Sequence, residues 1–73
     1  MAVVLKDVFS SNVSQVGYDH DAQELHVIWN TGKHSVYIGV PPALAENAST
    51  AHSVGKFLME NIKGQYEHSY VTN

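Results

Sequence analysis

The chain has 73 residues, enough for one small domain and too few for two. It has no cysteine, which excludes disulfides, thiolate metal ligands and cysteine nucleophiles. Seven acidic residues outnumber four lysines for a net charge of -3, and arginine, the usual bidentate ligand for phosphate, is absent. No apolar run is long enough for a signal peptide or a membrane span, so we expect a globular cytoplasmic protein that contacts no membrane.

The first third of the chain predicts strands. Residues 3–9 are apolar and β-branched, which indicates a short strand or a packed extended arm. Residues 13–18 form a second candidate strand, which lies between the polar segments 10–12 and 19–21.

The strongest local signal is a hairpin. Apolar residues alternate through 24–29, so that leucine, valine and tryptophan share one face of a strand. The Asn-Thr-Gly sequence at 30–32 predicts a tight turn, and residues 33–38 return as the partner strand.

Two registers of this hairpin compete. A three-residue loop with Gly32 in a bulge pairs Trp29 with Lys33 and puts Ser35 and Tyr37 on the Leu-Val-Trp face. A two-residue loop would instead place on that face His34, Val36 and Ile38. We favour the first register, because a glycine in the third loop position suits a bulged turn.

Two short helices are expected after the sheet, which Pro41 and Pro42 end. The first helix has a narrow stripe of mostly small residues: Leu44, Ala45, Ala48 and Ala51. The second has an amphipathic stripe: Val54, Phe57, Leu58 and Ile62. Ser53 is placed as its N-cap, with a hydroxyl that can accept a first-turn N–H, and Gly64 is placed where a left-handed residue ends a helix.

These elements predict a single α+β domain over residues 1–73. We expect a small antiparallel sheet of three or four strands, followed by two short helices packed on one face. The core covers about residues 8–66, and the tail 67–73 shows little pattern and is expected to be loose.

The dipeptide Gly55-Lys56 raises the question of a phosphate-binding loop. Such a loop needs G-x-x-x-x-G-K-[ST] after a strand. Here Thr50 stands in place of the first glycine, Phe57 replaces the hydroxyl residue, and a helix precedes the motif. We therefore expect Gly55 to let the second helix approach a neighbouring segment closely.

The polar residues do not predict metal binding or catalysis. Zinc needs three or four ligands, and although His26 and His34 can lie diagonally on one face, the other histidines stand in separate segments: His20, His52 and His68. The first turn is crowded with acids that commonly bond backbone N–H groups: Asp19, Asp21 and Glu24. We expect no metal, no cofactor, no small-molecule substrate and no enzymatic activity, because so small a core could hardly build a catalytic pocket.

The ordered pieces resemble a known family. They are Ser10-Ser11-x-Val13, Val16-Gly17-Tyr18-Asp19, Leu25-x-Val27-x-Trp29, Gly32, Tyr37, Val40-Pro41, Ala51-x-Ser53-x-Gly55-x-Phe57, Ile62-Lys63 and Tyr66. In this order the chain resembles the KTSC domain, which occurs at the C-terminus of some lysyl-tRNA synthetases and as short freestanding proteins of bacteria and their phages. The resemblance implies a small α+β fold and a role in RNA binding. The family has a central Tyr-x-Tyr, whereas this chain has Ser35 at the first position and so keeps half of any platform for stacking bases.

Our first functional hypothesis is a non-catalytic module for protein contacts or self-association. In the favoured register, Ile28, Val36 and Ile38 line the sheet face away from the helices. An apolar patch of this kind marks a partner surface or a homodimer contact, unless the arm at 3–9 folds across and covers it.

The alternative hypothesis is an RNA-binding domain. Its candidate residues are Lys33, Tyr37, Lys56 and Lys63. Because so few lysines can neutralise few phosphates, we expect such binding to be weak, sensitive to salt and led by shape.

Overall fold

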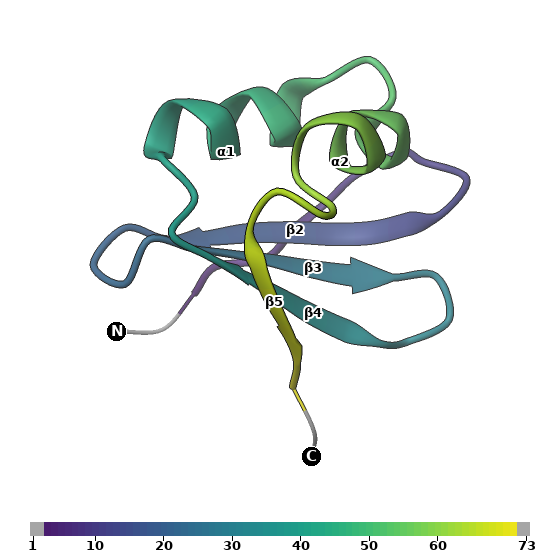
Figure 1. The fold of residues 1–73 in the computed structure, drawn as a ribbon. Coiled ribbons are helices and arrows are strands. Elements are labelled where there is room, and N and C mark those ends of the chain that lie inside the picture. The colour runs from purple at the N-terminus through teal and green to yellow at the C-terminus, as the bar shows by residue number, and fades with distance from the viewer. Residues whose placement is uncertain (1–2, 72–73) are drawn as a thin grey trace.

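The computed structural model describes residues 3–71. In this range it has seven elements (Figure 1): β1 (Lys6–Asp7), β2 (Val13–Asp19), β3 (Glu24–Trp29), β4 (His34–Ile38), α1 (Pro42–Thr50), α2 (Val54–Asn61) and β5 (Glu67–Tyr70). The strands form one antiparallel sheet in the order β1-β2-β3-β4-β5. The α+β class is confirmed, and the described residues form five strands where three or four were expected.

The β3–β4 hairpin has the three-residue register. Val27 lies opposite Ser35, and the Trp29 N–H donates to the Lys33 carbonyl at 2.9 Å. Gly32 has a φ of 92°, the left-handed conformation that the bulged turn requires. The Leu-Val-Trp face of β3 therefore packs toward the helices, as predicted.

Both helices lie over one face of the sheet, and the core fills the space between them (Figure 1). The small residues of α1 are buried at Ala45 and Ala48, which allows the helix to lie close to the sheet. The buried core consists of Val13, Val16, Leu25, Val27, Tyr37, Val40, Ala45, Ala48, Val54, Leu58 and Ile62.

The start of α2 answers the question raised by its glycine. Gly55 is buried, and a Cβ on it would lie 3.1 Å from the Ser10 Oγ, so the helix does approach a neighbouring segment closely. Ser53 is the N-cap as predicted, but its side chain makes no capping hydrogen bond, and the expected hydroxyl contact is wrong.

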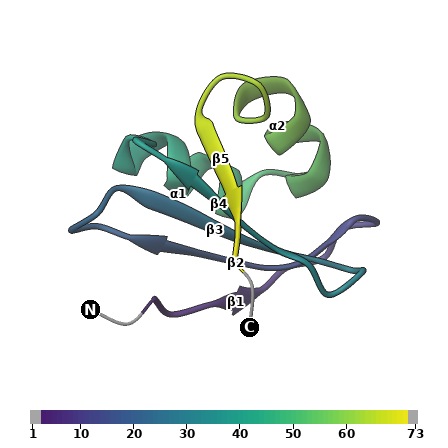
Figure 2. The same ribbon diagram turned by 60° about the horizontal axis from the view of Figure 1, so that its bottom comes forward.

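The N-terminal arm packs on the side of the sheet away from the helices (Figure 2). A Cβ on Gly17 would come within 2.7 Å of the Val3 Cγ1 and of the Val4 carbonyl oxygen. Only glycine leaves room for this crossing. The arm thus covers part of that face, as one of the two alternatives from the sequence proposed.

The expectation of a loose tail is wrong for Glu67–Tyr70. This segment pairs with β4 as the edge strand β5, with Ser69 opposite Val36 and His68 opposite Tyr37. All four side chains of β5 are exposed, so the strand has no alternation of apolar and polar residues that its sequence could reveal. Residues 72–73 lie outside the described range.

None of the helices within residues 3–71 has the length and apolar character that crossing a membrane requires.

Candidate functional site

A groove of about 560 Å³ opens where the end of α2 meets β4 and β5. We call it the aromatic groove. Its lining consists of Trp29, Lys33, Ser35, Tyr37, Met59, Lys63, Gly64, Tyr66, His68 and Tyr70. Among residues 3–71, the lining contains two ammonium groups and five aromatic rings but no carboxylate, although the chain as a whole is acidic.

The strand side of the groove is held by a buried polar contact. The Trp29 Nε1–H donates to the Ser35 Oγ at 2.7 Å, and Ser35 is only 1% exposed. The Ser35 hydroxyl fixes the orientation of the indole ring. A buried donor and acceptor that satisfy each other make this wall rigid.

Three rings follow one another from β4 to the end of β5. The centroids of Tyr37 and His68 are 4.8 Å apart, and those of His68 and Tyr70 are 4.6 Å apart at an interplanar angle of 83°. The Lys33 Nζ stands 5.6 Å from the Tyr70 ring centroid, within range of a cation–π contact.

Tyr37 itself is not available for stacking. It is only 3% exposed, and burial, followed by the nearby Tyr70, raises the pKa of its hydroxyl. Tyr37 was expected to present an exposed ring. The exposed rings here are instead those of His68 and Tyr70, and Tyr70 is 57% exposed. Sequence reasoning missed both residues because the segment that carries them was expected to be loose.

The predicted lysines converge only in part. Lys33 comes from the β3–β4 turn and Lys63 from the turn after α2, and both line the aromatic groove. Lys56 is exposed on α2 but does not line it.

The opposite side of the sheet, which we call the rear face, differs in charge. Cross-strand partners share a face, and the register places there Asp19 beside Glu24, and Glu67 beyond Ile38. Asp7 lies on the same face opposite Gln15, whereas the registers of the described strands place no lysine there.

The three predicted interaction residues do lie together on the rear face. However, Val36 is only 6% exposed, and Ile28 and Ile38 are half-buried. The expectation that this patch has little to cover it is therefore too strong. The large apolar side chains that are well exposed lie elsewhere, at Val4, Phe9, Met59, Tyr70 and Val71.

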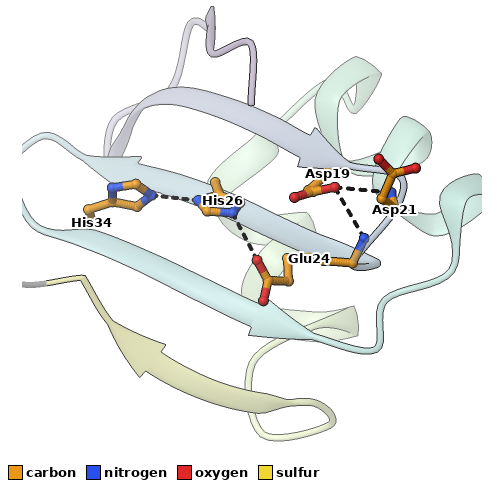
Figure 3. A network of polar contacts seen from close by, with 6 residues as sticks. Asp19, Asp21, Glu24, His26 and His34 are labelled. Atoms are coloured by element: carbon orange, nitrogen blue, oxygen red, sulfur yellow. Dashed lines mark hydrogen bonds and ion pairs between the residues drawn. The ribbon is translucent and has the colours of Figure 1, made fainter. Parts of the chain in front are cut away.

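Two histidines meet on the rear face (Figure 3). The His26 Nδ1 lies 2.8 Å from the His34 Nε2, and the His26 Nε2 lies 3.4 Å from the Glu24 Oε1. The carboxylate therefore approaches the wrong ring nitrogen to share a metal ion with His34. Among residues 3–71, no group of three or more histidine, aspartate or glutamate side chains is arranged to hold a metal.

A second hollow, of about 710 Å³, lies between the arm, β2 and α1. Although it is larger than the aromatic groove, three carboxylates line it, at Asp19, Asp21 and Glu46. The Asp19 Oδ1 accepts the amide N–H groups of Asp21 and Ala22 at 3.0 and 3.1 Å, which is the backbone role predicted for these turn acids (Figure 3). The larger hollow has one lysine beside these carboxylates, whereas the smaller groove has two lysines and five aromatic rings, so the smaller groove is the better candidate site.

Comparison with known proteins confirms the resemblance. The model of the KTSC domain matches residues 9–66. The chain belongs to the KTSC domain family. The crystal structure of a KTSC domain protein from Yersinia pestis is similar, with a TM-score of 0.93 and 30% identity over 97% of this chain and 100% of that one. No curated protein matches the chain. β5 lies beyond the end of the family match, so the rings of His68 and Tyr70 add to the part of the groove that the family model covers.

Proposed function

We propose that this KTSC chain is a non-catalytic binding module that holds a short single-stranded RNA segment in the aromatic groove. The observation that carries the proposal is the convergence of Lys33 and Lys63 on a carboxylate-free groove that also presents Tyr66, His68 and Tyr70. Ammonium groups attract the phosphate backbone, and ring faces accept bases of any sequence by stacking. The family resemblance favours RNA over DNA.

The number of lysines sets the expected strength. On a single strand, the logarithm of the binding constant changes with the logarithm of salt by about -0.7 for each phosphate contacted, so two lysines predict a slope of about -1.4. Base stacking on an aromatic ring contributes about 1–3 kcal/mol for each base. Binding is therefore weak, spread over two or three nucleotides, and readily lost as salt rises.

The groove chemistry supports the non-catalytic part of this proposal. A catalytic histidine is normally oriented by a carboxylate that bonds its second ring nitrogen. His68 contacts the rings of Tyr37 and Tyr70, and no carboxylate belongs to the groove lining.

The test is an amide NMR titration with oligouridine and with a mixed tRNA pool, at low and near-physiological salt. We expect salt-dependent shifts confined to residues around Lys33, Lys63 and β5. The variant Lys33→Gln/Lys63→Gln should lose at least about tenfold in affinity, which corresponds to about 1.4 kcal/mol.

A matched control separates a site from general charge attraction. The variant Lys6→Gln/Lys56→Gln removes the same net charge at two lysines that do not line the groove. It should bind nearly as well as the parent chain. Equal losses in both variants, or no shifts in the parent chain at low salt, would rule out the groove as an RNA site.

Protein contact through the rear face is the second candidate. The observation in its favour is that Ile28, Val36 and Ile38 lie together on neighbouring strands. Their partial burial leaves a smaller apolar area than the sequence suggested, and for that reason we place this function second.

A further inference from the structure

The rear face holds a chain of three side chains that the proposed function does not use. Glu24, His26 and His34 follow one another along the β3–β4 pair, with contacts of 3.4 Å and 2.8 Å (Figure 3). The His26 side chain is 13% exposed, and its Nε2 is buried without a hydrogen bond, 3.4 Å from the Glu24 Oε1. The contacts of a histidine placed in this way change when its ring gains or loses a proton.

We propose that Glu24, His26 and His34 form a proton relay that holds β3 to β4 while the rings are neutral and releases them when both rings are charged. The carboxylate selects the tautomer. The Glu24 carboxylate lies 3.4 Å from the His26 Nε2, and its negative charge favours a proton on that nitrogen over a lone pair. The proton of neutral His26 therefore lies on Nε2. The His26 Nδ1 is then an acceptor, and the His34 Nε2–H donates to it.

The two protonation steps of this relay are unequal. A first proton adds to the His34 Nδ1, which takes no part in the relay, and every contact in the chain persists. A second proton must add to the His26 Nδ1, which is the acceptor of the bond between the rings. That step replaces a hydrogen bond with two like charges about 2.8 Å apart.

The surroundings favour the neutral form of His34. Burial, and then the neighbouring His26, lower the pKa of His34. The cross-strand neighbours of His26 are Gly17 of β2 and Val36 of β4, and both are uncharged. The arm residues that cover Gly17 are apolar.

The other carboxylates of the rear face lie beside Glu24 or further from the two rings. Asp19 of β2 lies opposite Glu24, and its Oδ1 is occupied by two backbone amides. Glu67 of β5 lies beyond Ile38, and Asp7 of β1 bonds Gln15. None of these three carboxylates contacts the two rings in the described structure.

The sign of the pH effect follows from the lowered pKa. In the unfolded chain His34 takes up its proton near the ordinary histidine value of about 6.5. The folded protein takes it up only at lower pH, so stability is fully present above about 6.5 and decreases as pH falls below it.

The decisive measurement is the tautomer of His26, read from long-range proton–nitrogen NMR correlations of the imidazole rings at about pH 8, where free histidine is neutral. We expect a protonated Nε2 and an unprotonated Nδ1. The opposite tautomer, or an average of both, would overturn the relay. This spectrum needs only the parent chain, so it decides the proposal even where a variant fails to fold.

The variant His34→Gln tests whether protonation of the rings releases β3 from β4. Glutamine keeps an N–H donor toward His26 but cannot be protonated. Between about pH 8 and about pH 5, a range that spans the ordinary histidine pKa, the melting temperature of this variant should lose most of the acid-induced decrease seen in the parent chain. His52→Gln, at an exposed histidine before α2, should keep that decrease in full. An unchanged acid response in His34→Gln would contradict the release.

Discussion

The aromatic groove and the rear face lie on opposite sides of the same sheet, yet they carry opposite charges. The groove has Lys33 and Lys63 and no carboxylate among its lining residues. The rear face has four carboxylates, on Asp7, Asp19, Glu24 and Glu67, and no lysine in the described strand registers. The net charge of -3 averages over these two surfaces and describes neither of them.

This difference arises from the period of two in a β-strand. Successive side chains of the hairpin point to opposite sides, so His34 joins the rear face while Lys33 and Ser35 line the groove. Because a one-residue slip would exchange the two sets, the bulged turn at Gly32 decides which surface receives which chemistry.

The largest effect on folding stability is expected from Gly17→Val, which changes only the rear face. The new side chain would collide with the Val4 carbonyl oxygen, a backbone atom that cannot simply rotate away. We expect a loss of about 1–3 kcal/mol in the free energy of unfolding, measured by chemical denaturation. Ser69→Val, in the same row of the rear face but on the exposed strand β5, is the matched control and should change stability little. Equal stability in both variants would show that the arm does not pack under Gly17.

On the groove side, Tyr70→Ala removes the most exposed ring without touching the rear face. The loss of one stacking surface should reduce RNA affinity by about 1–3 kcal/mol, with little change in folding stability. Titration with oligouridine measures the effect, and Tyr70→Phe, which retains the ring, should bind like the parent chain. If the phenylalanine variant loses as much as the alanine variant, stacking is not the source of the affinity.

A smaller loss of stability than that of Gly17→Val is expected from Ile38→Glu, which tests the second candidate function. The new carboxylate would stand between Glu24 and Glu67, and like charges on opposite positions cost about 0.2–1 kcal/mol for each pair. The fold should survive, and any self-association or partner binding through the rear face should disappear in sedimentation experiments. Ile28→Glu should act in the same way, and global unfolding of both variants would show that these residues belong to the core.

The hairpin shows how far sequence reasoning reaches. Alternation through 24–29 and a glycine third in the loop predicted the strand, the turn type and the register, because all three depend on neighbours in sequence. The two amphipathic stripes predicted the helices for the same reason, and both helices lie on one face as expected.

The candidate site was only half predictable. Lys33 and Lys63 were named from the sequence, but their convergence depends on how α2 lies across β4. The burial of Tyr37 and the exposure of Tyr70 depend on β5, a strand whose four exposed side chains give no periodic signal. The diagonal placement of His26 and His34 was predicted from the sequence, whereas the approach of the Glu24 carboxylate to His26 was not.

The sequence by itself determined the KTSC fold class, the hairpin register and the two helices, because turn chemistry and hydrophobic periodicity act over a few neighbouring residues. Only the tertiary structure decided that a polar tail completes the sheet and that scattered lysines and rings form one groove. It also decided that four of the seven acidic residues lie on the other face. Those arrangements depend on contacts between residues such as Tyr37 and His68, which are distant in the chain and leave no local pattern.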